Sequence, residues 1–400
     1  MKKFLTVFLM VTWTIFAQKF EKLALTPPMG WEGWNKFGCN TNEELIKKMA
    51  DAMVASGMKD VGYQYIIIDD CWEGERDSLG FIHPDPNRFP SGIKAIADYV
   101  HSKGLKLGIY SDAGWKTCEE RPGSRGYEFQ DAIKYAEWGV DFLKYDWCNT
   151  KGLNAEEAYL TMRNALYAAK RPVVFSICEW GKNKPWEWAK DVGHLWRTAP
   201  DITPCFDCIV DHGSWEAWGI MQIIDREVGL RIYSGPDHWN DPDMLEVGNG
   251  MSVNEDRAHF SMWCMLAAPL IAGNDLSNMT DETKEILTNK EVISVDQDSL
   301  GIQGFRYSEE DGLEIWFKPL KDDNWAVCFL NRTTNPIDIN FAWREHRIVD
   351  SVFNKVADFK TTTYKIRDLW VKKDIGRTNK DFTEVVPAHD VVMLRLSPIK

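Results

Sequence analysis

Acidic side chains follow apolar segments at several places in the first three quarters of the sequence. Asp146 ends the apolar segment 142–145, and the adjacent acids Asp69 and Asp70 end the segment 65–68. An acid at the end of a buried strand costs free energy unless another group pairs with it or a function uses it. We therefore expect these acids to converge on one polar pocket.

Polar or aromatic side chains follow the other apolar segments in the same way. They include Trp34, Tyr110, Asp112, Lys144, Cys148, Glu179, Trp180, Arg197, Asp201, Asp241, Asp243, Asn274 and Asp275. An acid in such a position often caps the following helix, and we favour that interpretation for Asp243 and Asp275. It is weaker for Asp69 and Asp70, because adjacent carboxylates repel each other unless they share hydrogen-bond donors.

A pocket lined by several acids, a lysine, an arginine and tryptophans suits two kinds of chemistry. One is a magnesium site, which uses carboxylates but typically also holds a phosphate or enolate group. The other is hydrolysis of a glycosidic bond, which needs one ionised and one protonated carboxyl group. The chain has 19 tryptophans, and although most tryptophans belong to the core, an aromatic face is a common platform for a sugar. The residue types favour a sugar over a phosphate.

The pattern between residues 23 and 300 predicts an α/β fold. Apolar segments alternate with amphipathic stretches such as 42–57 and 92–104, which indicates a parallel sheet buried on both faces. The expected strands lie in segments 29–34, 63–72, 105–114, 140–148, 172–180, 194–201, 230–239 and 268–275. Their number and spacing predict a (β/α)₈ TIM barrel, with a doubly wound open sheet as the alternative. No GxGxxG motif follows the first strand, which disfavours dinucleotide binding.

The hydrophobic pattern changes after residue 300. Apolar and polar residues alternate in four segments with turn residues between them, at 312–320, 324–332, 336–341 and 390–396. Alternation with a period of two is typical of strands that have one buried face. Residues 301–400 are therefore expected to form a small antiparallel β domain.

The amino terminus has the pattern of a signal peptide at residues 1–17. Lys2 and Lys3 precede an apolar run that is too short to span a membrane. We therefore expect an exported protein, periplasmic or secreted, without a membrane anchor. The formal net charge of −13 argues against nucleic acid or an anionic membrane as a partner. Export permits disulfides, and for the CxxC pair Cys205 and Cys208 we favour a local disulfide or two unpaired thiols over zinc.

Several short motifs occur together and in a fixed order. They are MGWEGWN, IDDCW, LGIYSDAG with KTC, LKYDWC, CEWG, WRTAPDI and WNDPDML. Together they resemble glycoside hydrolase family 27, the α-galactosidases and their relatives. The resemblance covers roughly residues 23–304, and the β domain more loosely. It implies a (β/α)₈ barrel followed by an antiparallel β-sandwich, and it implies no cofactor or metal.

The resemblance also implies catalytic roles. Asp146 corresponds to the nucleophile, and Asp201, four residues after Arg197, corresponds to the general acid/base. The family retains anomeric configuration, which requires a glycosyl–enzyme intermediate and carboxyl groups about 5–5.5 Å apart. We expect Lys144 to lower the pKa of the nucleophile, and the acid/base to hold its proton to higher pH.

The same mapping places a galactose ring among the remaining residues. Asp69 and Asp70 correspond to ligands of the 4- and 6-hydroxyls, and Lys144 and Arg197 to ligands of the 2-, 3- and 4-hydroxyls. Trp34, Tyr110, Cys148, Trp180 and Asp241 complete the expected sugar site. Glu179 corresponds to the position near the 2-hydroxyl, where members that act on N-acetylgalactosamine carry a small residue. It therefore favours an α-galactoside as the substrate.

Cysteine pairs and alternatives complete the predictions. The resemblance implies disulfides Cys39–Cys71 and Cys118–Cys148, and it leaves Cys178 without its usual partner. The sequence ITPCFDC after Asp201 departs from the family pattern and leaves the leaving-group preference open. The alternatives are a β-L-arabinopyranosidase, an α-N-acetylgalactosaminidase and a galactoside-binding protein without catalysis. Self-association through the β domain is a further hypothesis.

Overall fold

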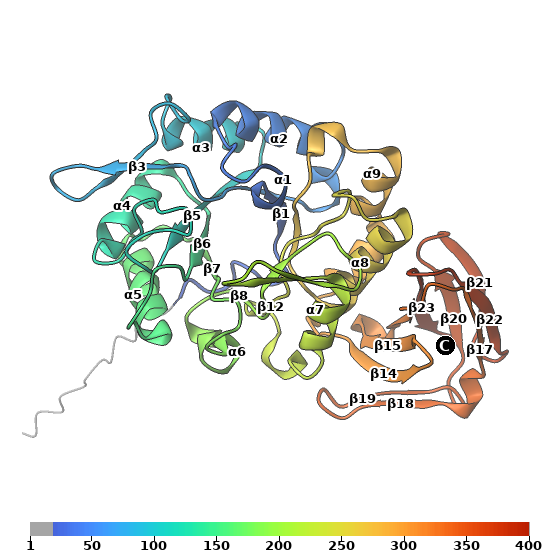
Figure 1. Cartoon of the computed structure of the whole chain (residues 1–400). Helices are drawn as coiled ribbons and strands as arrows, with labels where there is room; N and C mark the ends of the chain where they lie inside the picture. The colour runs from blue at the N-terminus through green and yellow to red at the C-terminus, as the bar shows by residue number, and fades with distance from the viewer. Residues whose placement is uncertain (1–18, 400) are drawn as a thin grey trace, which may run out of the picture.

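The computed structural model describes residues 19–399, which form a barrel of parallel strands and a smaller antiparallel β structure (Figure 1). The expected signal peptide at residues 1–17 lies outside the described residues. Within residues 19–399, no helix is long and apolar enough to cross a membrane.

The larger part is built on an eight-stranded parallel sheet. In hydrogen-bonded order its strands are β12 (Trp239–Asp241), β8 (Leu195–Arg197), β7 (Val174–Ile177), β6 (Phe142–Asp146), β5 (Lys106–Asp112), β2 (Tyr65–Ile68), β1 (Met29–Glu32) and β13 (Leu270–Ala272). Leu245, four residues after β12, pairs in parallel with Ala272 of β13. This bridge closes the ring, so the predicted (β/α)₈ barrel is confirmed and the open doubly wound sheet is wrong.

Helices surround the strands on the outside of the barrel (Figure 1). They are α2 (Glu43–Ala55), α3 (Ile93–Ser102), α4 (Glu128–Trp138), α5 (Ala155–Ala168), α6 (Pro185–Trp188), α7 (Ile220–Glu227), α8 (Val253–Leu266), α9 (Asp281–Leu287) and α10 (Lys290–Asp296). The short helix α1 (Trp34–Phe37) instead lies beside β1, inside this ring of helices (Figure 1). Side-chain caps fix several starts, because Asn42 and Asn154 accept backbone N–H groups of the first turns of α2 and α5. A capping box of Ser252 and Glu255 starts α8.

One barrel strand begins later than its apolar segment predicts. The segment 230–239 forms the 3₁₀ helix η3 (Arg231–Tyr233) and a turn, and only Trp239 belongs to β12. The N–H groups of Gly235 and His238 donate to each other's carbonyl oxygens at 2.8 and 3.0 Å, around Pro236. Proline lacks the N–H group that a central strand needs, so the chain turns before it enters the barrel.

The smaller part is an antiparallel β-sandwich with a core of its own. A six-stranded sheet contains, in order, β14 (Phe305–Glu310), β15 (Leu313–Pro319), β16 (Trp325–Asn331), β23 (Val391–Pro398), β20 (Tyr364–Asp368) and β21 (Lys373–Arg377). Two further pairs are β17 (Ile337–Phe341) with β22 (Phe382–Val386), and β18 (Arg347–Asp350) with β19 (Lys355–Asp358). Phe317, Phe329, Phe341 and Trp343 pack together in its core. The predicted antiparallel fold is confirmed.

The sandwich packs against the barrel through buried side chains. Trp316, Cys328 and Met393 belong to the same hydrophobic core as the barrel residues, and β16 and β23 contact α8. Arg231 donates two hydrogen bonds, of 2.9 and 2.5 Å, to the buried carboxylate of Asp350 in β18. The two parts are therefore joined by apolar packing and by a bidentate ion pair.

Candidate active site

A cleft of about 760 Å³ opens at the carboxyl ends of the barrel strands. This lies in the upper part of the roughly 300–1,000 Å³ range of typical small-molecule pockets. Ten of the twelve residues that the sequence predicted for catalysis and sugar binding line it: Trp34, Asp69, Asp70, Tyr110, Lys144, Asp146, Cys148, Trp180, Arg197 and Asp201. The convergence of polar residues from separate strand ends is confirmed.

Asp146 and Asp201 line the same cleft in contrasting surroundings. Asp146, the last residue of β6, is 6 % exposed, whereas the side chain of Asp201 is 44 % exposed. The hydroxyl of Tyr110 donates to Asp146 Oδ2 at 3.0 Å, and the N–H of Trp147 donates to Oδ1 at 2.9 Å. Arg197 Nη2 lies 3.1 Å from Asp201 Oδ1. One carboxyl group is thus enclosed and oriented, and the other faces solvent.

Burial raises the pKa of Asp146 to about 7, although the ammonium group of Lys144 acts in the opposite direction. The expectation that Lys144 lowers the pKa of this carboxyl group is therefore right in direction, but burial outweighs the effect of the lysine. Lys144 Nζ donates instead to Glu32 Oε1 at 2.6 Å and to Asp69 Oδ2 at 2.7 Å. Its charge is largely balanced by these partners, so it offsets only part of the desolvation of Asp146.

Glu32, Asp69 and Lys144 form a cluster of ion pairs that we call the closed end of the cleft; Asp69 and Lys144 line the cleft, and Glu32 lines a small adjoining cavity. Burial and the charge of Asp69 raise the pKa of Glu32 well above its usual range. Burial also acts to raise the pKa of Asp69, but the ammonium group of Lys144 and a hydrogen bond from Glu32 outweigh it, and the net pKa is lowered. These directions describe a protonated Glu32 beside an ionised Asp69. The sequence prediction missed Glu32, although it ends the first apolar segment within MGWEGW.

Arg197 is held by two acids, Asp201 and Asp243, and Asp243 was interpreted from the sequence as a helix cap. Its Nη2 atom lies 2.7 Å from Asp243 Oδ2, closer than to Asp201. Asp243 also accepts the N–H of Ile202 at 2.8 Å and so anchors the short strand that begins with Asp201. The helix-cap interpretation of Asp243 is wrong, because α8 starts ten residues later, at Val253.

Asp275 does act as a cap. It is the N-cap of the 3₁₀ helix η4 (Leu276–Asn278), where its Oδ1 atom accepts the N–H of Ser277 at 2.9 Å. The cap interpretation was therefore correct for one acid of the pair and wrong for the other. The difference is that Asp243 has a buried arginine within reach.

Two residues predicted for the sugar site, Glu179 and Asp241, are not among the described residues that line the cleft. Glu179 Oε2 accepts the backbone and side-chain N–H groups of Asn183, both at 2.6 Å, so this carboxyl group is turned toward its own loop. Asp241 lines a small inner cavity of about 20 Å³ and accepts the N–H of Asp243 at 3.0 Å. Local N–H donors thus orient both side chains, but Glu179 Oε1 has no hydrogen-bond partner among the described residues, so the sugar-binding roles of both stay predictions. The preference for galactose inferred from Glu179 stays a prediction as well.

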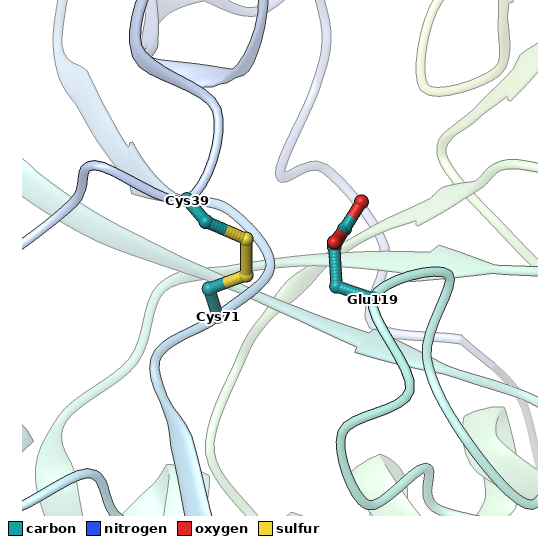
Figure 2. Close-up of side chains that lie close together, drawn as sticks. All are labelled: Cys39, Cys71 and Glu119. Carbon is teal, nitrogen blue, oxygen red and sulfur yellow. A yellow bond between two sulfur atoms is a disulfide. The ribbon is translucent and has the colours of Figure 1, made fainter.

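Two disulfides brace loops beside the cleft. Cys39–Cys71 and Cys118–Cys148 form as the resemblance implied. Figure 2 shows the first of them with Glu119 on the neighbouring loop, and the N–H of Glu119 donates to Asp70 Oδ2 at 3.0 Å. The loop thus holds the second acid of the Asp69–Asp70 pair. These sulfur atoms are joined to each other, so they offer no thiolates to a metal.

The remaining cysteines divide into one local pair and three buried thiols. Cys205 and Cys208 form a disulfide, one of the two arrangements favoured from the sequence. Cys178, Cys264 and Cys328 are free and buried. Cys178 also lines the cleft near Arg197, whose Nη1 lies 3.7 Å from its sulfur. The sequence placed Cys178 at the end of the fifth strand segment, but no role in the sugar site was predicted for it.

The unusual sequence after Asp201 folds as a hairpin at the mouth of the cleft. Strands β10 (Ile209–Asp211) and β11 (Glu216–Trp218) pair antiparallel, and β11 pairs in parallel with β9 (Asp201–Ile202). The candidate acid/base therefore belongs to the same small sheet as the hairpin. Five hairpin residues line the cleft: Asp211, Gly213, Ser214, Trp215 and Glu216.

A (β/α)₈ barrel whose strand ends place two carboxyl groups and a cluster of polar residues around one cleft has the architecture of a glycoside hydrolase. Comparison with known proteins specifies the class. The family model described as alpha galactosidase A matches residues 26–298, and the model described as the alpha galactosidase C-terminal beta sandwich domain matches residues 310–396. The chain belongs to this family, glycoside hydrolase family 27, and is a glycoside hydrolase.

Individual relatives of known family align with nearly the whole length of this chain. An alpha-galactosidase A from Cellvibrio japonicus is 57 % identical over 98 % of this chain and 96 % of its own length. Among solved structures, alpha-galactosidase I from Mortierella vinacea is 38 % identical with a TM-score of 0.87, covering 94 % of this chain and 98 % of that one. The alpha-galactosidase from Saccharomyces cerevisiae with raffinose is 30 % identical with a TM-score of 0.85, covering 94 % and 98 %.

A more remote likeness is restricted to the fold. A family 27 β-L-arabinopyranosidase from Geobacillus stearothermophilus is 23 % identical to this chain. Its TM-score is 0.79, and the match covers 94 % of this chain and 97 % of that one.

Proposed function

We propose that this chain is a retaining exo-α-galactosidase that removes terminal non-reducing α-D-galactosyl residues, with Asp146 as nucleophile and Asp201 as general acid/base. The observation that carries the proposal is that both carboxyl groups line one cleft, one buried and held by donors, the other open to solvent. A group that attacks must be fixed and ionised, whereas a group that exchanges protons with water must be reached by water.

The reaction has two steps. In the first, Asp146 attacks the anomeric carbon while Asp201 transfers its proton to the departing oxygen, which leaves a galactosyl ester on Asp146. In the second, Asp201 takes a proton from water, the water oxygen attacks the same carbon, and the ester bond to Asp146 breaks. The hydroxyl of Tyr110, which donates to Asp146 Oδ2, stabilises the carboxylate before attack and after release.

The closed end of the cleft supplies the selectivity for a terminal galactose. Asp69 is ionised there, and its Oδ2 already accepts from Lys144, so it is oriented to accept sugar hydroxyls as well. Asp70 lies next to it in the cleft. A buried carboxylate left without its hydroxyl partner is costly, so an epimer with its 4-hydroxyl in the other orientation is rejected. The side chains of Asp69 and Lys144 are largely buried at this end, which favours a terminal sugar over one inside a chain.

The opposite end is open, and it suits an oligosaccharide leaving group. The cleft volume and the family relationship both support a substrate such as raffinose. The test is hydrolysis of p-nitrophenyl α-galactoside by the wild type, Asp146→Asn and Asp201→Asn, with the first-formed anomer identified by proton NMR. Retained configuration and loss of turnover in Asp146→Asn are expected. An inverted product, or wild-type protein that binds the galactoside without cleaving it, would refute the proposal.

Parallel assays separate the sibling specificities. We expect the rate on the α-galactoside to exceed the rates on p-nitrophenyl β-L-arabinopyranoside and on the α-N-acetylgalactosaminide. The arabinopyranoside lacks the carbon-6 hydroxymethyl group that Asp69 and Asp70 are proposed to bind. A faster rate on either alternative would reassign the substrate while leaving the two carboxyl roles in place.

We also propose export, a signal peptide at residues 1–17 and two domains at 23–300 and 301–400. The support is the disulfides at the cleft, because such bonds persist in oxidising compartments. Helix α10 ends at Asp296 and β14 begins at Phe305, which is compatible with that boundary. Fractionation of expressing cells with amino-terminal sequencing tests the export, and light scattering tests self-association.

A further inference from the structure

The hairpin β10–β11 adds a wall to the cleft that the catalytic mechanism does not use. Its exposed residues Asp211, Ser214, Trp215 and Glu216 line the open end, opposite in character to the buried cluster around Lys144. Because β11 pairs with β9, its position is fixed relative to Asp201 by backbone hydrogen bonds: Ala217 pairs with Asp201 itself. The hairpin is therefore held directly beside the group that is proposed to protonate the leaving oxygen.

The base of the hairpin is built for rigidity. The Cys205–Cys208 disulfide closes it, and the N–H groups of Gly219 and Ile220 donate to Cys208 and Cys205 carbonyl oxygens at 2.7 and 2.9 Å. A Cβ atom on Gly219 would lie 2.7 Å from the Cys205 oxygen, so only glycine permits this close approach. An ordered base favours a defined contact at the tip.

Trp215 has one ring face covered and the rest of its surface open. His212 stacks on it with a centroid distance of 4.1 Å and an interplanar angle of 18°. Trp215 is nevertheless 49 % exposed and lines the cleft. Trp215 is one of several exposed large apolar side chains, but it lies in the wall of the cleft, where a flat aromatic face can complement the apolar C–H face of a sugar. Asp211 and Glu216 beside it offer carboxylate acceptors for hydroxyl groups.

We propose that the hairpin β10–β11 forms a leaving-group subsite, in which Trp215 stacks on the first sugar unit released when the galactosyl bond breaks. This inference rests on the proposed galactosidase function and extends it to the part of the substrate that is not galactose. The subsite selects substrates whose leaving group is a sugar ring, and it orients the departing oxygen toward Asp201. Trp215 is a specificity residue for the reaction; it does not touch the anomeric carbon.

The test compares two substrates that differ in the leaving group. Raffinose releases a disaccharide large enough to reach the hairpin, whereas α-galactosyl fluoride releases only fluoride. In Trp215→Ala, the ratio of kcat/KM on raffinose to kcat/KM on the fluoride is expected to fall about tenfold, which corresponds to about 1.4 kcal/mol. Trp215→Phe retains an aromatic face and is expected to keep most of the ratio. An unchanged ratio in Trp215→Ala would overturn the subsite.

A matched control is Trp115→Ala, because Trp115 is 62 % exposed on another loop and is not among the described residues that line the cleft. It should leave the ratio unchanged, and an equal fall in both variants would refute a specific role for Trp215.

Calorimetry in the Asp146→Asn background gives a second measurement: raffinose should bind more tightly than galactose, and Trp215→Ala should remove the difference. If wild-type protein cleaves neither substrate, the proposed function fails and the subsite with it. If it cleaves both with a ratio that Trp215→Ala does not change, the subsite fails alone.

Discussion

Removing the hydroxyl group of Tyr110 perturbs the candidate nucleophile at a single atom. This hydroxyl donates to Asp146 Oδ2 at 3.0 Å inside the buried part of the cleft. The variant Tyr110→Phe keeps the ring and leaves no large cavity. A hydrogen bond to a charged group contributes about 1.5–3 kcal/mol, and each pKa unit corresponds to about 1.36 kcal/mol. The pKa of Asp146 is therefore expected to rise by about one to two units in this variant.

The direction of the change in activity follows from the role of Asp146. Burial places the pKa of Asp146 at about 7, and the carboxyl group must be ionised to attack. The value of kcat/KM thus falls as the pH drops below about 7, and a higher pKa of Asp146 moves this acidic limb of the pH profile to higher pH. At pH 6, kcat/KM of Tyr110→Phe should be lower than that of the wild type by about tenfold or more.

The assay is the pH profile of kcat/KM on p-nitrophenyl α-galactoside from pH 4 to pH 9, recorded for both proteins. Tyr159→Phe is a matched control, since Tyr159 is equally buried but donates to the backbone oxygens of Tyr145 and Asp146 at 3.1 and 3.4 Å and not to the Asp146 carboxyl group. It should change the free energy of unfolding by about 1 kcal/mol and leave the acidic limb in place. An acidic limb that does not move in Tyr110→Phe would refute the assignment of Asp146 as the ionised attacking group.

Two further changes test the electrostatics and the disulfides. Burial lowers the pKa of His259 to about 3, so the folded protein disfavours its protonation and loses stability as the pH falls from about 6.5 toward 3. The variant His259→Gln can still accept the N–H of Glu246. It should flatten the pH dependence of the free energy of unfolding by about 1.4 kcal/mol per pH unit in that window. Chemical denaturation at pH 6.5 and 4.5 measures this slope, and an unchanged slope would contradict the prediction. Replacing Cys118 and Cys148 together by alanine should lower the free energy of unfolding by about 3 kcal/mol, and the melting temperature should fall with it. A variant as stable as the wild type would show that the disulfide is dispensable.

The barrel was predictable because its signals are local and repeated. Apolar segments of strand length recur with amphipathic helices between them, and caps such as Asn42 and Asn154 mark where helices start. Parallel strands place their carboxyl ends at one face, so the gathering of Asp69, Asp146 and Arg197 followed from topology alone. The seventh strand was misplaced because the apolar side chains of Leu230 and Tyr233 pack against the core without belonging to a strand.

The parts of the site that were not predictable depend on contacts across the fold. The pKa of Asp146 is set by burial and by the partners that engage Lys144, and neither is visible in the spacing of the two residues. Glu179 stands at a strand end, and the N–H groups of Asn183 in its own loop hold one of its carboxylate oxygens. Sequence position identifies which residues can reach the cleft; competing hydrogen bonds decide which of them face it.

Covalent trapping of the nucleophile tests the central claim most directly. A slow substrate such as 5-fluoro-α-galactosyl fluoride should inactivate the protein and leave one galactosyl label per chain, located by proteolysis and tandem mass spectrometry. The account predicts the label on the peptide that contains Asp146, and no label in Asp146→Asn. A label carried by Asp201 or by another residue, with Asp146 unmodified, would contradict it.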